Sequence, residues 1–483
     1  MRIPLQDLIL RNQGITELGR YFNKDFAGYA DSDYADERGF HVYGRMRPKL
    51  KLYAPDNGGD ANRMYRAIQA FTKISAECAA SYGGQLLEAQ GVMTHFLFPE
   101  EENTARTQER IIEFANVLFA GVEQTVKPIC GNFWNGFAVS ADHGRAILVS
   151  GSADSVVSLG PCANRPAKRI YRRDDRLGVP AGELHIRNMD GTWRKEVLSP
   201  ASVNIQLRNK QSNFVGLAEE IVREATSQTP MVRHLGYEDI PAFMAGKRDT
   251  PVTVQAHMAR ADMHNFTKRV SEAFEAGNNT AIQQLATEFT QTMTEGEQTI
   301  ASYDAPTHQL PWAGDCANFV IMPTSDGYDS DRAAISAKLG AHWHDAMSKN
   351  KGRSNEVSWT LGCAGGGAEN EANGLLLIGL VQADNRSFKI VAGWGATHSQ
   401  RAQEMDDAQE YDTAVPDCDY QALTSVLQPL YRQCGSTFNQ HRFYRAEGLT
   451  EKKVKGAYIG GLAKQTVSVK EPVSAPYVRH YAR

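Results

Sequence analysis

The sequence lacks long hydrophobic runs. Its longest apolar stretch, Gly374–Val381, fits a buried strand and is far shorter than the ~20 residues that a membrane helix needs. The opening segment Met1–Asp7 is interrupted by Pro and Asp before an apolar signal region can form. We therefore expect neither a membrane span nor a secretory signal.

Cysteine is scarce, and charge of neither sign dominates. The 483 residues include seven Cys with no C-x-x-C pair, which favours free buried thiols in a reducing, cytoplasmic setting over a disulfide framework or a zinc site. The net charge of -4 gives no reason to expect a nucleic-acid partner. Local basic segments such as Arg169–Arg173 are typical of solvated faces.

The sequence contains the same order of expected strands and helices twice. A hydrophobic content of 42% and a charged content of 22% are typical of globular protein, and the length suggests about two to four domains of ~100–200 residues each. In each copy strands alternate with helices and hairpins, which predicts α+β domains with one sheet each.

The expected elements follow one order in both copies. The first copy has a strand at 50–53 with a turn at 55–59, a helix at 62–81, a strand–turn–strand at 86–96, a helix at 102–123, strands at 134–139, 146–149 and 156–160, and a helix from 164. The second has a strand ending at 262, helical stretches over 266–286 and on to 300, a strand–turn–strand around 314–315, a helix at 330–348, strands at 359–362, 375–380 and 390–395, and a helix from 397.

Four segments result from this pattern. They are an N-terminal extension (1–44), a first domain (45–225), a second domain (226–418) and a C-terminal extension (419–483). We expect a hairpin at 182–197 and a helix at 215–225 between the copies, and a helix at 423–432 in the tail.

Two aspartates stand where apolar runs of the second copy meet turns. Asp262 ends a strand pattern and precedes a helical one, and Asp315 lies in a tight Gly-Asp turn. Two carboxylates at adjacent strand ends are what a hard divalent cation with phosphate-rich ligands needs. Taken singly, Asp262 also fits a helix N-cap and Asp315 a turn residue.

Several motifs resemble the signatures of the class III nucleotidyl cyclases, the adenylate and guanylate cyclase superfamily. Over roughly residues 45–175 and 250–410, five segments carry this resemblance. Ala261–Thr267 resembles D-I-x-x-F-T, Gly314-Asp315 resembles I-G-D-G, Ala89–Phe96 resembles the same second signature with Gln90 for Asp, and both Gly160–Lys168 and Gly393–Arg401 resemble G-x-x-V-N-x-A-A-R.

The resemblance implies a fold and a set of roles. Two tandem cyclase-homology domains with ferredoxin-like sheets would form an intramolecular pseudo-heterodimer. Asp262, Asp315 and the Met263 carbonyl would hold two divalent cations, Mn²⁺ or Mg²⁺. The backbone N–H groups of His264, Asn265, Phe266 and Thr267, at a helix start, would cradle the triphosphate.

The other half of the site is implied in the first copy. Asn164 would hold the ribose, and Lys168 or Arg169 would act on the reacting phosphate, a choice that the sequence leaves open; the alternative is an N-cap and a solvated face. Because Gln90 removes the second Asp from the first copy and Thr397 replaces Asn in the second, the resemblance implies one composite site. The opposite pairing of Gln90 with Thr397 and Arg401 looks inactive, and Asp56 matches a metal position poorly.

The substrate follows from a departure from the family pattern. Purine cyclases carry polar base-reading residues at the positions of Leu86 and Val157, which are apolar here. This favours the pyrimidine cyclases of bacterial antiphage systems (the Pycsar type), with UTP as substrate and a cyclic nucleotide read by a separate effector protein. The alternatives are a cytidylate cyclase, a purine cyclase, and a non-catalytic nucleotide-sensing module.

Overall fold

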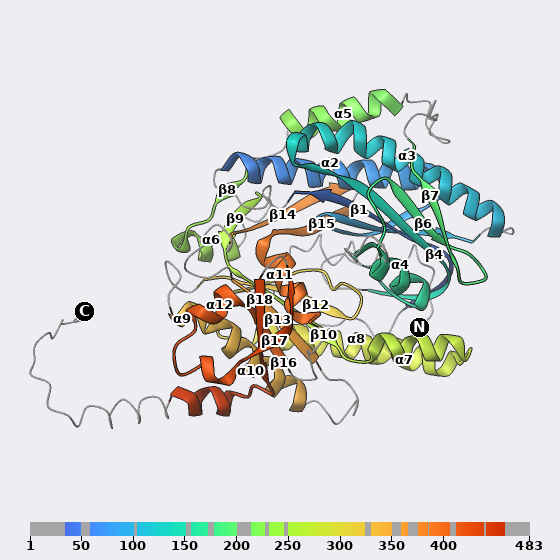
Figure 1. Ribbon diagram of the computed structural model, residues 1–483. Coiled ribbons are helices and arrows are strands. Elements are labelled where there is room, and N and C mark those ends of the chain that lie inside the picture. Colours follow the sequence, from blue (N-terminus) through green and yellow to red (C-terminus); the bar gives the residue numbers. More distant parts are fainter. Residues whose placement is uncertain are drawn as a thin grey trace, which may run out of the picture.

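The chain folds as an α+β protein (Figure 1). The structure, a computed structural model, describes residues 34–49, 58–100, 104–150, 156–171, 178–199, 214–227, 231–245, 250–323, 330–349, 359–365, 375–384, 386–405, 412–438 and 441–458. Within these ranges the strands form two seven-stranded sheets and one four-stranded sheet. The predicted fold class is therefore confirmed at this level.

The first sheet is built around its longest pairing, between β1 (Tyr34–Pro48) and β4 (Trp134–Ser150). β1 also pairs antiparallel with β3 (Met93–Pro99), which forms a hairpin with β2 (Gln85–Gln90). On the far side of β4 lie three shorter strands. They are β5 (Val156–Leu159), β6 (Glu183–Arg187) and β7 (Trp193–Val197).

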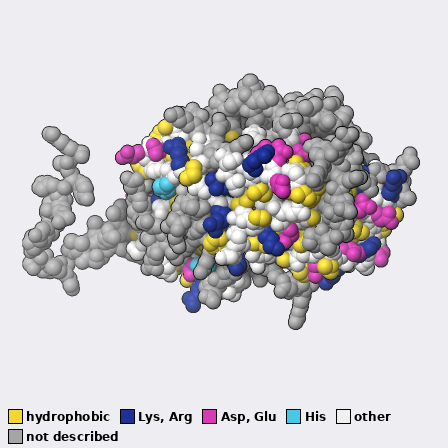
Figure 2. All heavy atoms as spheres, turned by 90° about the horizontal axis from the view of Figure 1, so that it is seen from above, with side chains coloured by type: hydrophobic (Ala, Val, Ile, Leu, Met, Phe, Trp, Pro, Cys, Tyr) yellow, Lys and Arg dark blue, Asp and Glu magenta, His cyan; other side chains and the backbone are white. Residues whose placement is uncertain are grey.

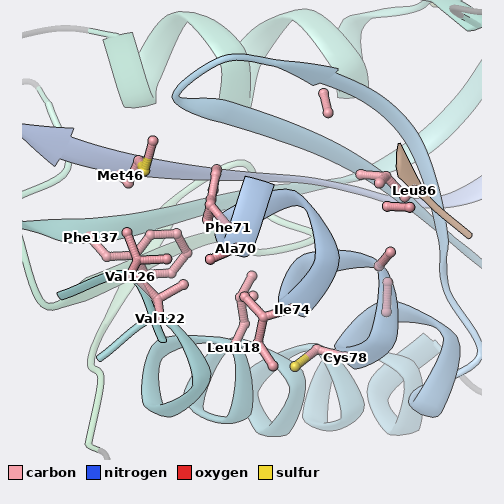
Figure 3. Close-up of a cluster of buried hydrophobic side chains, with 14 of the residues drawn as sticks. Met46, Ala70, Phe71, Ile74, Cys78, Leu86, Leu118, Val122, Val126 and Phe137 are labelled. Atoms are coloured by element: carbon pink, nitrogen blue, oxygen red, sulfur yellow. The ribbon is translucent and has the colours of Figure 1, made fainter. Parts of the chain in front are cut away.

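Helices α2 (Gly58–Ser81), α3 (Thr104–Cys130) and α5 (Phe214–Ser227) lie on one side of this sheet (Figure 1). Apolar side chains three or four positions apart give each helix a buried stripe. Figure 3 shows the result: Phe71 and Ile74 of α2 and Leu118 of α3 meet in one buried cluster.

The second sheet repeats the strand order of the first. β10 (His257–Met263) lies between β12 (Cys316–Ile321) and β13 (Trp359–Ala364), as β1 lies between β3 and β4. The remaining strands extend both edges. They are β11 (Thr307–Gln309) beside β12, and β16 (Asp412–Pro416), β18 (His441–Glu447) and β17 (Arg432–Phe438) beyond β13. In both sheets a parallel strand and then an antiparallel one follow the central trio, β6–β7 in the first and β16–β18 in the second.

The two halves pack into each other through strand hairpins. The small third sheet contains β8 (Arg233–His234), β9 (Val252–Gln255), β14 (Leu375–Ala383) and β15 (Arg386–Gly393). From its β14–β15 hairpin, Leu377 and Phe388 enter the hydrophobic core of the first half. Reciprocally, Ile147 and Val157 of β4 and β5 enter the core of the second half. Each half thus completes the core of the other.

Helices surround the second sheet and flank the contact between the halves. They are α4 (Pro161–Tyr171), α6 (Ile240–Ala245), α7 (Phe266–Glu275), α8 (Asn279–Ala301), α9 (Ser330–Ala333), α10 (Ile335–Lys349), α11 (Trp394–Gln403) and α12 (Asp417–Ala422).

Several expected elements are confirmed and others are corrected. The hairpin at 182–197 and the helix at 215–225 are present as β6–β7 and α5. The stretch 266–286 is divided between α7 and α8, because Gly277 has a positive φ of 63° and Asn278 caps α8 through the Ala281 amide. The two strands expected at 134–139 and 146–149 are one strand, β4.

The ends of the two sheets differ from the expected boundaries. β1 begins at Tyr34, inside the segment expected to be an extension, because its exposed charged residues hide the strand pattern. The expected strand at 50–53 and Asp56 lie outside the described residues. The helix expected at 423–432 is wrong: after a single 3-10 turn at Gln428–Leu430, β17 and β18 extend the second sheet.

Charge and cysteine usage agree with the sequence pattern. Figure 2 shows Lys and Arg side chains interspersed with Asp and Glu on one face of the molecule. The structure describes all seven cysteines, and each is a free thiol. Among the described residues, no helix has the length and apolar character required to span a bilayer.

Candidate active site

The strand register brings Asp262 and Asp315 to the same end of the second sheet. Asp262 of β10 pairs with Cys316 of β12, and the Met263 amide donates to the Asp315 carbonyl at 3.2 Å. Gly314 turns the chain with a φ of 60°, a conformation that glycine adopts at no steric cost. The pairing predicted from the two motifs is therefore present as geometry.

The two carboxylates, Asp262 and Asp315, repel one another when both are ionised. Their partial exposure is confined to a deep cavity, so desolvation raises the pKa of Asp262 well above its usual range, and the nearby Asp315 raises it further. Desolvation also raises the pKa of Asp315, opposed by the Thr267 hydroxyl, which donates to its Oδ2 at 2.8 Å, and by the charge of Lys168. A divalent cation would relieve this repulsion, so the donor set fits one.

The start of α7 lies beside these carboxylates. Asn265 adopts a left-handed φ of 61°, which redirects the chain from β10 into the helix, and the buried Phe266 ring anchors the first turn in the core. His264, Asn265 and Thr267 line the cavity. The Thr267 amide also bonds to Asp315, so Thr267 supports that carboxylate through both its backbone and its hydroxyl.

One cavity joins the two halves. It has a volume of about 860 Å³, and Asn164 and Lys168 of α4 line it together with Asp262 and Asp315. An ion pair between Arg165 of α4 and Glu275 of α7, at 3.4 Å, lies between the two contributing helices. The composite grouping expected from the sequence is therefore observed. The side-chain amide of Asn164 has no hydrogen bond to another described residue.

The structure distinguishes Lys168 from Arg169. The Arg169 Nε donates to the His185 Nδ1 at 2.9 Å, and its guanidinium lies 4.5 Å from the centre of the Trp193 ring. Arg169 therefore faces the β6–β7 hairpin. Lys168 is exposed to the cavity, where its charge lowers the pKa values of both Asp262 and Asp315.

Leu86, expected at a base-reading position, does not reach the cavity. It is 1% exposed and packs in the core of the first half, where Figure 3 places it. A β-bulge between Leu86 and Glu88 shifts the register of β2 against β3, and Glu88 lines the cavity in its place. Desolvation raises the pKa of Glu88 to about 8, although the Gln90 side-chain amide donates to its Oε1.

Further cavity residues were missed because no sequence motif marks them. Val157 lines the cavity as expected, but so does its neighbour Ser158, whose buried hydroxyl has no hydrogen-bond partner among the described residues. Tyr43 lies stacked on His95, with ring centroids 4.1 Å apart. Period-two alternation in β1 and β3 could have indicated the faces of Tyr43 and His95, but only after β1 itself had been found.

A second, smaller pocket lies at the equivalent position across the contact. It has a volume of about 80 Å³ and is lined by Gln90, Thr397 and Arg401, the pairing expected to be inactive. In the second half, Asp262 lies opposite Cys316, the residue after Asp315. In the first half, the residue after Gln90 is Gly91. The Arg45–Met93 pair and the bond from the Met46 amide to the Val92 carbonyl set a register that places Arg47 opposite Gly91, so Arg47 is equivalent to Asp262. The Arg47 guanidinium donates to the Val179 carbonyl and is not among the described residues that line this pocket, so of the two equivalent positions only Gln90 faces it.

Comparisons with known proteins agree with this architecture. No family model matches the sequence, and no curated protein matches it. A crystal structure of a class III adenylyl cyclase-like ATP-binding protein from Pseudomonas aeruginosa matches over 94% of this chain and 98% of its own, with a TM-score of 0.64 at 12% identity. The chain has a class III cyclase-like fold.

Two other solved structures match less closely. The guanylyl cyclase Cya2 matches 42% of this chain and 96% of its own at 11% identity, with a TM-score of 0.32. A bacterial light-regulated adenylyl cyclase matches 89% of this chain and 99% of its own at 11% identity, also with a TM-score of 0.32. The assignment of the cyclase-like fold therefore rests on the Pseudomonas protein.

Proposed function

We propose that the protein is a nucleotidyl cyclase that converts a nucleoside triphosphate into its 3′,5′-cyclic monophosphate and pyrophosphate. UTP is the favoured substrate. The observation that carries the proposal is the single cavity shared by Asp262, Asp315, Asn164 and Lys168. These residues come from two halves of the chain, so the cavity supports an intramolecular pseudo-heterodimer with one working site.

The proposed roles follow from charge and position. Asp262, Asp315 and the Met263 carbonyl would hold two divalent cations, which when bound supply charge neutralisation for the triphosphate and lower the pKa of the ribose hydroxyl. The amides from His264 to Phe266, at the start of α7, would face the phosphates. Thr267 would hold Asp315 in place through its 2.8 Å hydrogen bond.

The reaction itself needs positioning more than covalent chemistry. A bond forms between the ribose O3′ and the α-phosphorus, the bond to the β-phosphate oxygen breaks, and the O3′ proton passes to water. Asn164 would orient the ribose with its unengaged amide, and Lys168 would stabilise the negative charge that develops on the phosphate. Lys168 acts here as a point charge rather than as a bidentate fork.

The base would lie against the first half of the chain. Tyr43 and His95 line this side of the cavity as a stacked pair. Glu88 and Ser158 offer polar groups there. With its raised pKa, a protonated Glu88 both donates and accepts, which suits the adjacent N3–H and carbonyl groups of uracil. A cytidylate cyclase is the nearest alternative.

A second candidate, a non-catalytic nucleotide-binding module, is favoured by one specific observation. Lys168 takes the place where the family carries an arginine, and the structurally similar Pseudomonas protein is described as ATP-binding. For the cyclase, a role in antiphage defence, with the cyclic nucleotide read by a separate effector, is part of the proposal and rests on the sequence resemblance alone.

One assay separates these functions. The purified full chain is incubated with Mn²⁺ and, separately, with ATP, GTP, UTP and CTP, and the products are identified by mass spectrometry. Cyclic UMP is the expected product. Cyclic AMP or GMP would overturn the pyrimidine assignment, and nucleotide binding without any cyclic product would favour the binding module.

Pseudo-symmetric variants provide the controls. We expect Asn164→Ala and Asp315→Ala each to remove most activity, because each deletes a group of the composite site. Thr397→Ala and Gln90→Ala change the equivalent positions of the second pocket and should retain activity. Equal losses in both pairs would contradict a single working site.

A further inference from the structure

The second pocket carries an unusual set of charges. Four cationic side chains line it, and no Asp or Glu is among its described lining residues. They are Arg45 of β1, Arg260 of β10, Lys389 of β15 and Arg401 of α11. Arg401 is ion-paired with Glu404 at 2.5 Å, and the other three cations, converging from three elements, create a positive potential that favours an anion.

Arg45 and Arg260 occupy equivalent places in the two halves. Arg260 lies two residues before Asp262, and Arg45 lies two residues before Arg47, the position equivalent to Asp262. Both side chains line this pocket, and the Arg45 Nη1 also donates to the Ile170 carbonyl at 3.2 Å. The buried Nε of Arg260 has no hydrogen-bond partner among the described residues, which leaves a desolvated donor at this pocket.

The backbone of α11 adds to the positive character. The pocket is also lined by Gly393, Ala396 and Thr397, at the N-terminal end of this helix. A helix N-terminus presents unpaired N–H groups and a partial positive charge to an anion.

The size of the pocket selects the class of ligand. A volume of about 80 Å³, against about 860 Å³ for the large cavity, favours a small oxyanion over a nucleoside. We propose that this pocket is a binding site for an inorganic-phosphate-sized oxyanion, held between the two halves by Arg45, Arg260, Lys389 and Arg401. The proposal stands whether or not the large cavity catalyses cyclisation.

The test compares variants that separate the two spaces. Phosphate binding to the full chain is measured by calorimetry, with chloride substituted at constant ionic strength as the blank. Lys389→Met removes a charge that lines the small pocket, and Lys268→Met removes one that lines the large cavity. We expect phosphate affinity to fall about tenfold or more in Lys389→Met and to stay near wild type in Lys268→Met, because charge-assisted hydrogen bonds are the strong ones.

Two outcomes would overturn the site. One is the absence of phosphate binding by the wild-type chain, and the other is a loss confined to Lys268→Met, which would assign the anion to the large cavity. If Lys389→Met fails to fold, Arg45→Gln serves as the second variant, since Arg45 lines only the small pocket. Pyrophosphate and a nucleoside monophosphate are titrated into both the wild type and Lys389→Met; a loss of affinity in the variant that is largest for phosphate supports the free oxyanion, and an equal or larger loss for either of the other two contradicts it.

Discussion

Glu88→Gln should make the free energy of unfolding markedly less sensitive to a rise in pH from about 4.5 to about 8. Glu88 is 7% exposed, and desolvation raises its pKa from the ordinary 4.5 to about 8 in the folded chain, against the opposing influence of Gln90 and Arg386. The folded state therefore holds a proton that the unfolded state has lost between these two pH values. Stability contributed by neutral Glu88 is present at low pH and falls as the pH rises from about 4.5 to about 8.

The difference between the two pKa values of Glu88 sets the scale of this effect. A displacement of about 3.5 pKa units at ~1.4 kcal/mol per unit gives an upper limit of about 5 kcal/mol, reached only above the folded pKa. Between about pH 5 and about pH 8, the free energy of unfolding of the wild type should fall by roughly 3 kcal/mol more than that of Glu88→Gln. The amide keeps the shape of the carboxyl group and can still bond to Gln90.

Denaturant unfolding at a series of pH values, followed by circular dichroism, measures the difference. Groups that titrate in both proteins cancel in the comparison, which leaves the contribution of Glu88. Glu219→Gln, on the exposed face of α5, is the matched control and should follow the wild type. If wild type and Glu88→Gln lose stability in parallel, Glu88 is ionised in the folded protein and the protonated role proposed for it fails.

Two further changes test the supports around the site. Thr267→Val removes the hydroxyl that donates to Asp315 at 2.8 Å and should weaken Mn²⁺ affinity by about 10- to 100-fold in calorimetry, whereas Thr287→Val, on the exposed face of α8, should not. Arg386→Met leaves the Leu87 carbonyl, now bonded at 3.0 Å, without its partner and should lower the free energy of unfolding by about 1–3 kcal/mol, a loss that denaturant titration would contradict if it were absent.

Much of the site could be predicted because its key residues follow from local patterns. Asp262 and Asp315 each stand where a strand meets a turn, and the strand–turn–strand motif around Asp315 fixes its register against β10. Asn164 and Lys168 lie one helical turn apart, so one face of α4 presents both to the cavity. These residues were predicted from the resemblance of short local motifs to cyclase signatures, which can be recognised without knowing the fold.

Other parts depend on partners distant in the sequence. Three consecutive charged residues, Asp36, Glu37 and Arg38, interrupt the strand pattern of β1, and only its long pairing with β4 explains why such a segment is a strand. The sequence at 423–432 predicts a helix, yet the chain that follows forms β18, which pairs with the edge of β16 and extends the sheet. In both cases tertiary pairing overrides local propensity.

The side of the cavity that Glu88 lines shows how one inserted residue in a strand changes a prediction. Counting back from the turn gives Leu86, but the bulge in β2 places Leu86 in the core and Glu88 in the cavity. Arg386 reaches from β15 to the carbonyls of Leu86 and Leu87, so the opposite half of the chain holds the bulge in place. The polarity of this side of the cavity is therefore set by contact between the halves. A change at Arg386 should alter base selectivity as well as stability, and unchanged product ratios in a folded Arg386→Met variant would refute this link.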